Sequence, residues 1–219
     1  MFRKRPILLY ALRLVLLAFA VATAFQVGVV GANLISRVQH PVNSPPAAMN
    51  PVQQLASIFT PEVMHWSPLI HAWASAYNVD PNLIATVIQI ESCGDPNAVS
   101  NSGAQGLFQV MPDHFASGED TLEVLTNGRR GMEYLAKALQ IAAGDPGLAL
   151  AGYNGGVNLI NLGWGRWPAE TRRYYQWGIG IYDDASKGRP VSQTVQDWLK
   201  AGGERLCQKA SQEQLVARR

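Results

Sequence analysis

One glutamate closes an apolar helical stripe, and a run of glycines and small polar residues follows it directly. Leu83, Ile84, Val87, Ile88 and Glu91 fall at helical spacing and share one face. That face should point into a core, where the loss of water raises the pKa of a carboxyl group. The pattern therefore predicts an acid that is still protonated near neutral pH, as a general acid must be. The alternative is a carboxylate that merely lies near a helix end or pairs with an arginine.

The helix that carries this glutamate has readable ends. Asp80 can cap its N-terminus, and Pro81 suits the first helical position, where no N–H is needed. The segment Gly94-Asp95-Pro96 does not continue a helix comfortably. Glu91 is therefore expected in the last turn, where the negative end of the helix dipole also disfavours an ionised carboxylate.

Several ordered motifs follow along the chain. The first stands without a gap at Glu91-Ser92, Asp95-Pro96, Ala98, Ser100, Gly103-Ala104, Gly106-Leu107, Gln109 and Met111-Pro112. Two more stand at Tyr153-Asn154-Gly155 and at Glu170-Thr171 with Tyr174. Together these motifs resemble the soluble lytic transglycosylase family, lysozyme-like enzymes that cleave peptidoglycan. The resemblance covers roughly residues 62 to 186.

The resemblance implies a mainly α, lysozyme-like (α+β) fold with a small β-hairpin beside the catalytic helix. The Gly-rich, partly alternating segment 103–110 is the best place for that hairpin. With 219 residues and 47% hydrophobic composition, the chain can bury one sizeable core. Helical patterns are expected from Ser67-Pro68, over 122–143, from Asp145-Pro146 to near Tyr153, over 170–186 and over 193–201.

The chain divides by composition into four segments. A basic patch at residues 3–5 precedes an apolar run that approaches the ~20 residues needed to span a bilayer. Ala22-Thr23-Ala24 resembles a signal-peptidase site, so residues 1–36 are either a signal anchor or a cleaved signal peptide. A Pro-rich linker is expected over 37–60, the catalytic domain over 61–186 and a C-terminal helical extension over 187–219.

Two cysteines fit an exported domain, where disulfides are tolerated. We predict that Cys93 and Cys207 are bridged, which would tie the C-terminal extension to the loop after Glu91. The alternative is two unrelated buried thiols. No histidines at ligand spacing accompany these cysteines, so neither a metal site nor a cofactor is expected.

The resemblance implies cleavage of the β-1,4 bond between MurNAc and GlcNAc. The N-acetyl group of MurNAc can attack its own anomeric carbon, so one enzyme acid suffices. Glu91 would donate a proton to the leaving oxygen and then deprotonate the C6 hydroxyl, which closes a 1,6-anhydro ring. Two alternatives remain: a lysozyme-type hydrolase of the same bond, which needs a carboxylate to activate water, and a non-catalytic cell-wall-binding module.

The same resemblance places further side chains around the substrate. Six are expected to line the cleft: Ser100, Gln109, Met111, Tyr153, Asn154 and Glu170. Tyr153 is expected to hydrogen-bond the acid or the substrate, and Glu170 to position groups around Tyr153. Each has an ordinary structural alternative, such as turn hydrogen bonding, core filling or a helix-end charge. Trp164, Trp167 and Trp177 could stack on sugar faces or pack in the core.

The expected partners follow from the same arguments. A formal charge of +2 and the lack of a basic stripe with interleaved aromatic residues argue against nucleic acid. Peptidoglycan glycan strands are the implied substrate, the membrane is a partner through the N-terminal segment, and we expect a monomer. The catalytic domain should then act outside the cytoplasm in a bacterial cell envelope, either anchored or secreted.

Overall fold

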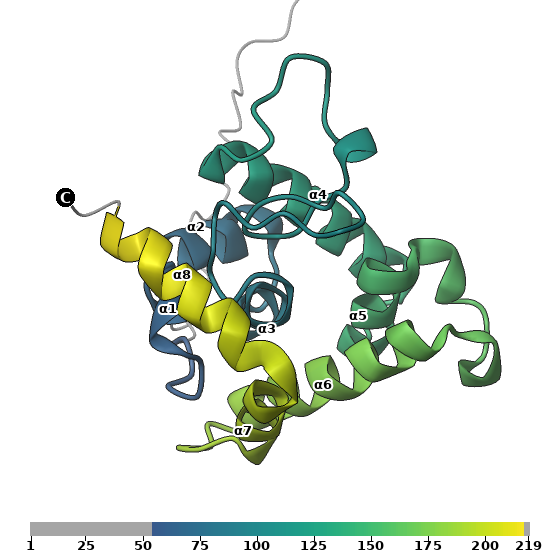
Figure 1. Cartoon of the computed structure of the whole chain (residues 1–219). Coiled ribbons are helices and arrows are strands. Elements are labelled where there is room, and N and C mark those ends of the chain that lie inside the picture. Colours follow the sequence, from purple (N-terminus) through teal and green to yellow (C-terminus); the bar gives the residue numbers. More distant parts are fainter. Residues whose placement is uncertain (1–53, 217–219) are drawn as a thin grey trace, which may run out of the picture. The chain divides into compact units, whose positions relative to one another are not determined.

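Helix α3 (Pro81–Glu91) lies at the centre of residues 54–216, the part of the chain that the computed structural model describes (Figure 1). The Asp80 side chain caps it by accepting a hydrogen bond from the Asn82 backbone N–H at 2.8 Å. Pro81 occupies the first helical turn, and the helix ends at Glu91. Both predicted ends of this helix are therefore confirmed.

Helix α3 is buried on nearly every side and not only on its apolar stripe. The polar residues Asn82, Thr86 and Gln89 are buried together with the aliphatic ones. The Asn82 Oδ1 atom accepts from the Ala56 backbone N–H at 2.9 Å, and the Gln89 Oε1 atom accepts from the Thr60 N–H at 3.0 Å. Buried polar groups that keep hydrogen-bond partners are tolerated. These side chains therefore fasten the segment before α1 across the central helix.

The last residues of the predicted linker pack into the core. Leu55, Ile58 and Phe59 are buried in the main core. Burial of such a side chain contributes about 1.5–3 kcal/mol, so residues from Leu55 onward belong to the packed unit and are not a solvated tether. Residues 37–53 and the predicted signal segment, 1–36, lie outside the described residues, and the other domain boundaries stay predictions.

The remaining helices surround α3 (Figure 1). Five begin and end close to the expected positions: α2 (Ser67–Tyr77), α4 (Val124–Ile141), α5 (Pro146–Gly155), α6 (Ala169–Ser186) and α7 (Gln193–Trp198). Four short elements were not expected: α1 (Pro61–Met64), η1 (Pro112–His114), η2 (Val157–Leu159) and η3 (Trp164–Arg166). Helix α4 approaches the loop after α3 so closely that a Cβ atom at Gly131 would lie 2.4 Å from the Phe108 ring.

The expected β-hairpin is not confirmed, although the mainly helical fold is. Within residues 54–216 the antiparallel pairing is limited to two isolated bridges, Val99–Gln105 and Gln105–Val110. The buried side chain of Asn127 holds this turn by two hydrogen bonds to its backbone. The Asn127 Oδ1 atom accepts from the Phe108 N–H at 2.9 Å, and its Nδ2 atom donates to the Gln105 carbonyl at 2.8 Å. Helix α4 therefore fixes this turn through one amide.

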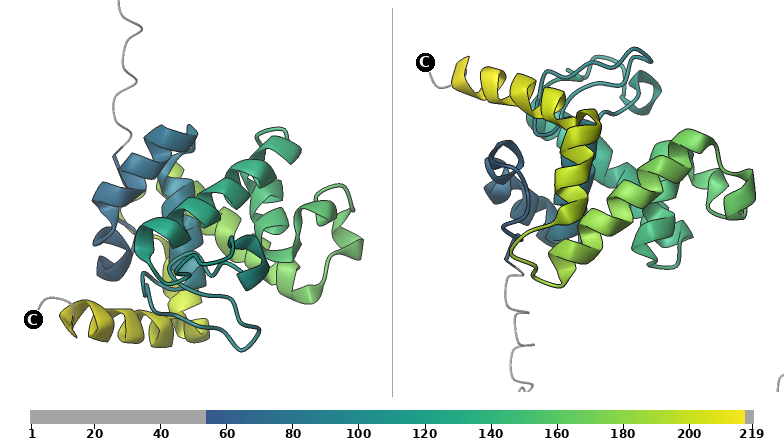
Figure 2. Two further views of the ribbon diagram at one scale, coloured as in Figure 1. Left: turned by 90° about the horizontal axis from the view of Figure 1, so that it is seen from above. Right: turned by 60° about the horizontal axis from the view of Figure 1, so that its bottom comes forward.

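The C-terminal extension folds back on the rest of the unit. Helix α7 continues into η4 (Leu199–Gly203), where Gly202 has a φ of 127° and redirects the chain. Helix α8 (Glu204–Val216) then runs alongside the loop that follows α3 (Figure 2). Within residues 54–216, every helix is too short or too polar to cross a bilayer.

Candidate active site

Glu91 is the last residue of α3 and lies at the edge of a cavity. Its side chain keeps partial exposure to solvent, but the dense packing around the carboxyl removes most of its hydration. This desolvation raises the pKa of Glu91 from 4.5 to about 8. The Tyr174 hydroxyl acts in the opposite direction and lowers this pKa, and the negative charge of Glu170 raises it to a smaller extent. At neutral pH the carboxyl is therefore mainly protonated, yet it can still be reached.

Tyr174 of α6 is the side chain that most favours the ionised form of Glu91. Its hydroxyl oxygen is buried and makes no hydrogen bond of regular geometry within the described part of the chain. The hydroxyl is nevertheless near enough to lower the pKa of the Glu91 carboxyl. Burial, followed by the charge of Glu91, raises the pKa of Tyr174 well above 10. The phenol thus stays neutral, and its O–H interacts with the acid rather than with another residue of the described chain.

Tyr153 of α5 is also buried close to Glu91, but its hydroxyl is committed elsewhere. It donates to the Phe108 carbonyl oxygen at 2.8 Å. Burial and then the charge of Glu91 raise the pKa of Tyr153 well above 10. In this structure Tyr153 therefore anchors the loop after α3, and of the two tyrosines it is Tyr174 that has the O–H available to the acid.

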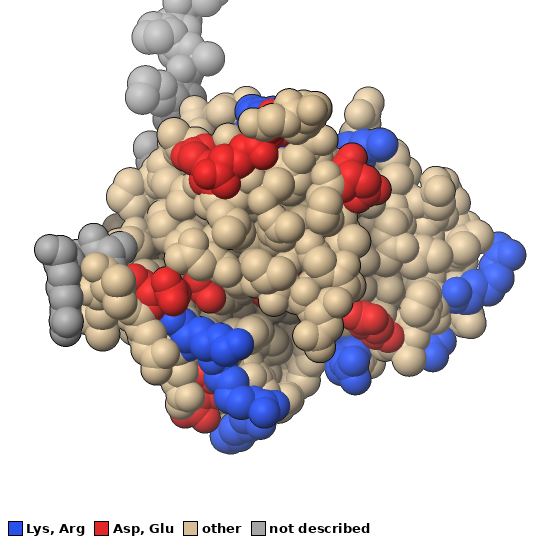
Figure 3. All heavy atoms as spheres, turned by 45° about the horizontal axis from the view of Figure 1, so that its top comes forward, with Lys and Arg blue, Asp and Glu red and all other residues tan. Residues whose placement is uncertain are grey.

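Three neighbouring cavities are linked by shared lining residues, and Glu91 borders one of them. We call the three together the cleft. One of about 580 Å³ lies between α3, α5, α6 and η4, and one of about 570 Å³ lies between the loop after α3 and α8. A smaller one of about 220 Å³ shares Asn154 with the first cavity and Gln109 with the second. Figure 3 shows the hollowed surface, which basic and acidic side chains border. Sizes of roughly 300–1,000 Å³ are typical of ligand sites.

The expected residues of the loop after α3 line this cleft while they also hold the loop. The Ser100 Oγ atom accepts from the Ala104 N–H at 2.9 Å, and the Gln109 Nε2 atom donates to the Ala98 and Gly106 carbonyls at 3.0 Å. Both residues border the 570 Å³ cavity with Glu91. Ser100 and Gln109 therefore make the turn hydrogen bonds that were considered as their structural role, and their contact with a ligand stays a prediction.

Gly106 is required by the amide clamp from α4. Its φ is 74°, and an added Cβ atom would lie 2.3 Å from the Asn127 Nδ2 atom. Met111 is 39% exposed and borders the 220 Å³ cavity together with Asn154. Met111 therefore faces the cleft and is not a core-filling residue.

One face of α6 supplies the wall opposite this loop. Glu170, Tyr174 and Trp177 follow at spacings of four and three residues, and all three border the 580 Å³ cavity. Trp167, in contrast, is buried and donates to the Leu159 carbonyl at 2.9 Å. Trp164 is exposed and contacts Trp167 with its ring tilted by 51°. Of the three tryptophans considered for sugar stacking, Trp177 is the one placed beside Tyr174.

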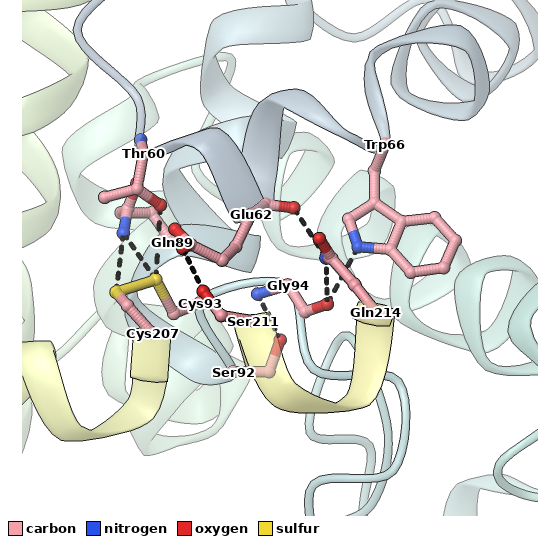
Figure 4. The surroundings of a disulfide bond; sticks show 10 residues. All are labelled: Thr60, Glu62, Trp66, Gln89, Ser92, Cys93, Gly94, Cys207, Ser211 and Gln214. Atoms are coloured by element: carbon pink, nitrogen blue, oxygen red, sulfur yellow. Dashed lines mark hydrogen bonds between the residues drawn. A yellow bond between two sulfur atoms is a disulfide. The ribbon is translucent and has the colours of Figure 1, made fainter. Parts of the chain in front are cut away.

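A disulfide joins Cys93 to Cys207, 114 residues apart in sequence (Figure 4). The Gln89 Nε2 atom of α3 donates to the Cys93 sulfur at 3.1 Å. The carbonyl of Gly94 accepts from the Trp66 Nε1 atom at 2.8 Å, so the backbone next to this cysteine is held from a second side. Helix α8 is therefore bonded to the loop two residues after Glu91.

Comparison with known proteins agrees with this geometry. Residues 68–168 match the family model described as the transglycosylase SLT domain. This segment is an SLT-family domain. Glu91, Tyr153 and the loop after α3 lie inside the matched SLT segment. Glu170, Tyr174 and the whole of α8 lie beyond it.

Two similar proteins illustrate how far the likeness extends. A curated protein named "Transglycosylase", from Enterobacteria phage PRD1, is 37% identical over 112 residues, which are 51% of this chain and 40% of the phage protein. A crystal structure of an inactive mutant of lytic transglycosylase Slt from Pseudomonas aeruginosa aligns with a TM-score of 0.48 and 23% identity, over 57% of this chain and 24% of that one. The SLT chain thus spans less than half the length of either.

Sequence reasoning missed two side chains that shape the SLT site. Tyr174 belonged to a recognised motif, but the motif alone did not place its hydroxyl at Glu91. A signal was available, since Glu170, Tyr174 and Trp177 share one helical face. The clamp by Asn127 carried no comparable local signal, because its partners lie 19 and 22 residues away in sequence.

Proposed function

We propose that this protein is a peptidoglycan lytic transglycosylase with Glu91 as its general acid and base. One observation carries the proposal: the carboxyl with a pKa of about 8 borders a cleft, beside the Tyr174 hydroxyl that interacts with it. The SLT domain and the phage transglycosylase support peptidoglycan as the substrate. No metal or cofactor is part of the proposed reaction.

The first step is cleavage of the bond between MurNAc and GlcNAc. The protonated Glu91 donates its proton to the glycosidic oxygen as the bond from that oxygen to C1 breaks. The carbonyl oxygen of the MurNAc N-acetyl group attacks C1 and forms an oxazolinium ion. Burial makes the acid form the resting form of Glu91, and Tyr174 stabilises the carboxylate that this step produces.

The second step replaces water by an internal hydroxyl. The Glu91 carboxylate takes the proton of the MurNAc C6 hydroxyl, and O6 attacks C1 while the bond from C1 to the acetamide oxygen breaks. A 1,6-anhydro ring forms, the N-acetyl group is restored and Glu91 ends protonated. We propose that Ser100, Gln109, Met111, Tyr153, Asn154 and Glu170 border the bound glycan, since all six lie in or beside the cleft around Glu91.

Hydrolysis is the second candidate, and Glu170 is the observation that favours it. Its carboxyl borders the 580 Å³ cavity with Tyr174 and lies near enough to raise the pKa of Glu91. Glycosidases that use two carboxylates place them on either side of the bond. Glu170 is nevertheless an exposed residue of the first turn of α6, so it lacks the desolvation that marks Glu91.

A non-catalytic wall-binding module is the third candidate. Such a module would gain nothing from an acid whose ionisation is disfavoured by burial. We also propose that the protein acts outside the cytoplasm, because peptidoglycan lies there, with residues 1–36 as its anchor or signal and with the protein as a monomer.

The experiment is digestion of purified sacculi. The wild-type protein should release soluble muropeptides, the E91Q variant should release none above background, and the E170Q variant should stay within a few-fold of wild type. Loss of activity in E170Q equal to that in E91Q would favour the hydrolase. Binding of wild-type protein to sacculi without soluble products would favour the wall-binding module.

A further inference from the structure

Helix α8 forms one wall of the cleft, although it lies beyond the SLT segment. Its residues Leu206, Lys209, Gln212 and Glu213 border the 570 Å³ cavity together with Glu91. The spacings of three and four residues put these side chains on one helical face. The half of the cleft on this side of Glu91 is therefore built partly by the C-terminal extension.

The opposite face of α8 is fastened to the body of the domain (Figure 4). Cys207 forms the disulfide with Cys93, the Ser211 hydroxyl is hydrogen-bonded to the Glu62 carboxylate, and the Gln214 Nε2 atom donates to the Glu62 and Gly94 carbonyls at 3.0 and 3.2 Å. These residues also follow at helical spacing. The helix thus has one attached face and one face that is presented to the cleft.

Lys209 is the one cation among the side chains that border this cavity. It is exposed and makes no ion pair with any residue of the described part of the chain. Burial raises the pKa of Asp95, and Lys209 lies near enough to that carboxyl to lower the pKa by a smaller amount.

Besides Glu91, two carboxylates border this cavity, and one asparagine donates a hydrogen bond to each of them. The Asp95 Oδ1 atom accepts from the Asn97 backbone N–H at 2.8 Å. The Glu213 Oε2 atom accepts from the Asn97 Nδ2 atom at 2.9 Å. Lys209 is therefore the charged group of the cavity that is left available to an incoming anion.

We propose that α8 forms a substrate subsite in which Lys209 binds a carboxylate of the peptide that peptidoglycan carries on its muramic acid. The proposal rests on the proposed function, because it places a peptide-bearing glycan in the cleft beside Glu91. Glycan hydroxyl and acetamide groups are neutral, so the peptide is the part of this polymer that offers carboxylates to a cation. An exposed cation at the cleft rim contributes modestly to affinity and depends on salt.

The test compares two lysine substitutions that remove the same charge. K209Q removes the cation of the cavity, and K200Q removes an exposed cation of η4 that pairs with Asp197 at 3.7 Å. Binding of soluble glycan fragments with and without peptide is measured by calorimetry in the E91Q background, which prevents turnover. We expect K209Q to weaken binding of peptide-bearing fragments about two- to five-fold, with little change for peptide-free fragments or for K200Q.

The outcomes separate this subsite from the proposed function. Equal affinity of K209Q and its parent for peptide-bearing fragments would overturn the subsite, as would equal losses on both fragments or an equal loss in K200Q. No binding of either fragment would overturn it too. A selective loss in K209Q supports the subsite even if the wild-type protein proves unable to cleave sacculi, a result that would reject the proposed function alone.

Discussion

The Tyr174 hydroxyl is buried beside the Glu91 carboxyl and has no regular hydrogen-bond partner in residues 54–216. A buried O–H without a partner costs roughly 1–3 kcal/mol, so its retention calls for a compensating role. The pair offers one. Burial favours the acid form of Glu91, and the phenol favours the carboxylate that remains after proton donation. The two effects keep both forms of the acid accessible during a catalytic cycle.

The pH dependence of the reaction should reveal the pKa of Glu91 and the effect of Tyr174 on it. Because the acid form is needed in the first step, kcat/KM should fall as pH rises through about 8. Since Tyr174 lowers the pKa of Glu91, Y174F should move this alkaline limb to higher pH. The neighbouring Y175F is the matched control and should leave the limb in place. An unchanged limb in Y174F would contradict the coupling between the two residues.

The same two tyrosines should differ in stability. The Tyr153 hydroxyl bonds the Phe108 carbonyl at 2.8 Å, so Y153F should lower the free energy of unfolding by about 1 kcal/mol. Y174F removes an oxygen whose interaction with Glu91 is not a hydrogen bond of regular geometry, so it should lower that free energy less than Y153F does. Denaturant titration of both variants checks this. A larger loss in Y174F than in Y153F would show that Tyr174 has a partner that the geometry does not reveal.

Replacement of the acid should remove activity and stabilise the fold. E91Q cannot donate a proton, and the loss of general acid catalysis alone costs roughly 10²–10⁴-fold. The folded protein keeps the Glu91 proton up to a pH of about 8, whereas the unfolded chain releases it near 4.5. The unfolded state therefore binds fewer protons between these values, and wild-type stability falls as pH rises through this window.

Unfolding experiments can test this linkage directly. The gain in unfolding free energy in E91Q over wild type should increase from pH 5 to pH 8. We expect an increase of about 1–3 kcal/mol after allowance for the partial exposure of the side chain. E204Q, at an exposed position of α8 that does not contribute to the pKa of Glu91, is the control and should show no such increase. A difference that stays constant between the two pH values would mean that the pKa of Glu91 is not raised.

The disulfide should stabilise the cleft wall. Denatured, unreduced protein should contain no free thiol, since Cys93 and Cys207 are bridged. Reduction should lower the free energy of unfolding by about 2–4 kcal/mol, and the C93A/C207A variant should no longer respond to reductant. Because Lys209 lies two residues after Cys207, reduction should also weaken binding of peptide-bearing glycan. Two free thiols in oxidised protein would reject the bridge.

Local signals predicted the helices better than they predicted the contacts between them. The start of α3 at Asp80-Pro81 and that of α5 at Asp145-Pro146 follow from caps whose partners lie two and three residues away. The hairpin expectation is not confirmed, because the described loop after α3 forms two isolated bridges and is held in addition by Asn127 of α4. Leu55, at the end of the predicted linker, is likewise buried in the core by contacts that local composition does not reveal.

The candidate site shows the same division. Glu91 was found from its own helix, because an apolar stripe already predicts desolvation of the carboxyl that ends it. The placement of Lys209 required the fold of the C-terminal extension, which depends on a glycine at 202 and on contacts more than 100 residues apart in sequence. No short-range pattern encodes such contacts, so the sequence left the role of this extension open.

The central claim is that the C6 hydroxyl of MurNAc replaces water at the anomeric carbon. Digestion of purified sacculi in H₂¹⁸O, followed by mass analysis of the new MurNAc ends, tests this claim most directly. We expect 1,6-anhydro ends that carry almost no ¹⁸O, with their formation lost in E91Q. One ¹⁸O atom in each new reducing end would contradict it, and would identify the protein as a hydrolase with Glu170 as the first base to examine.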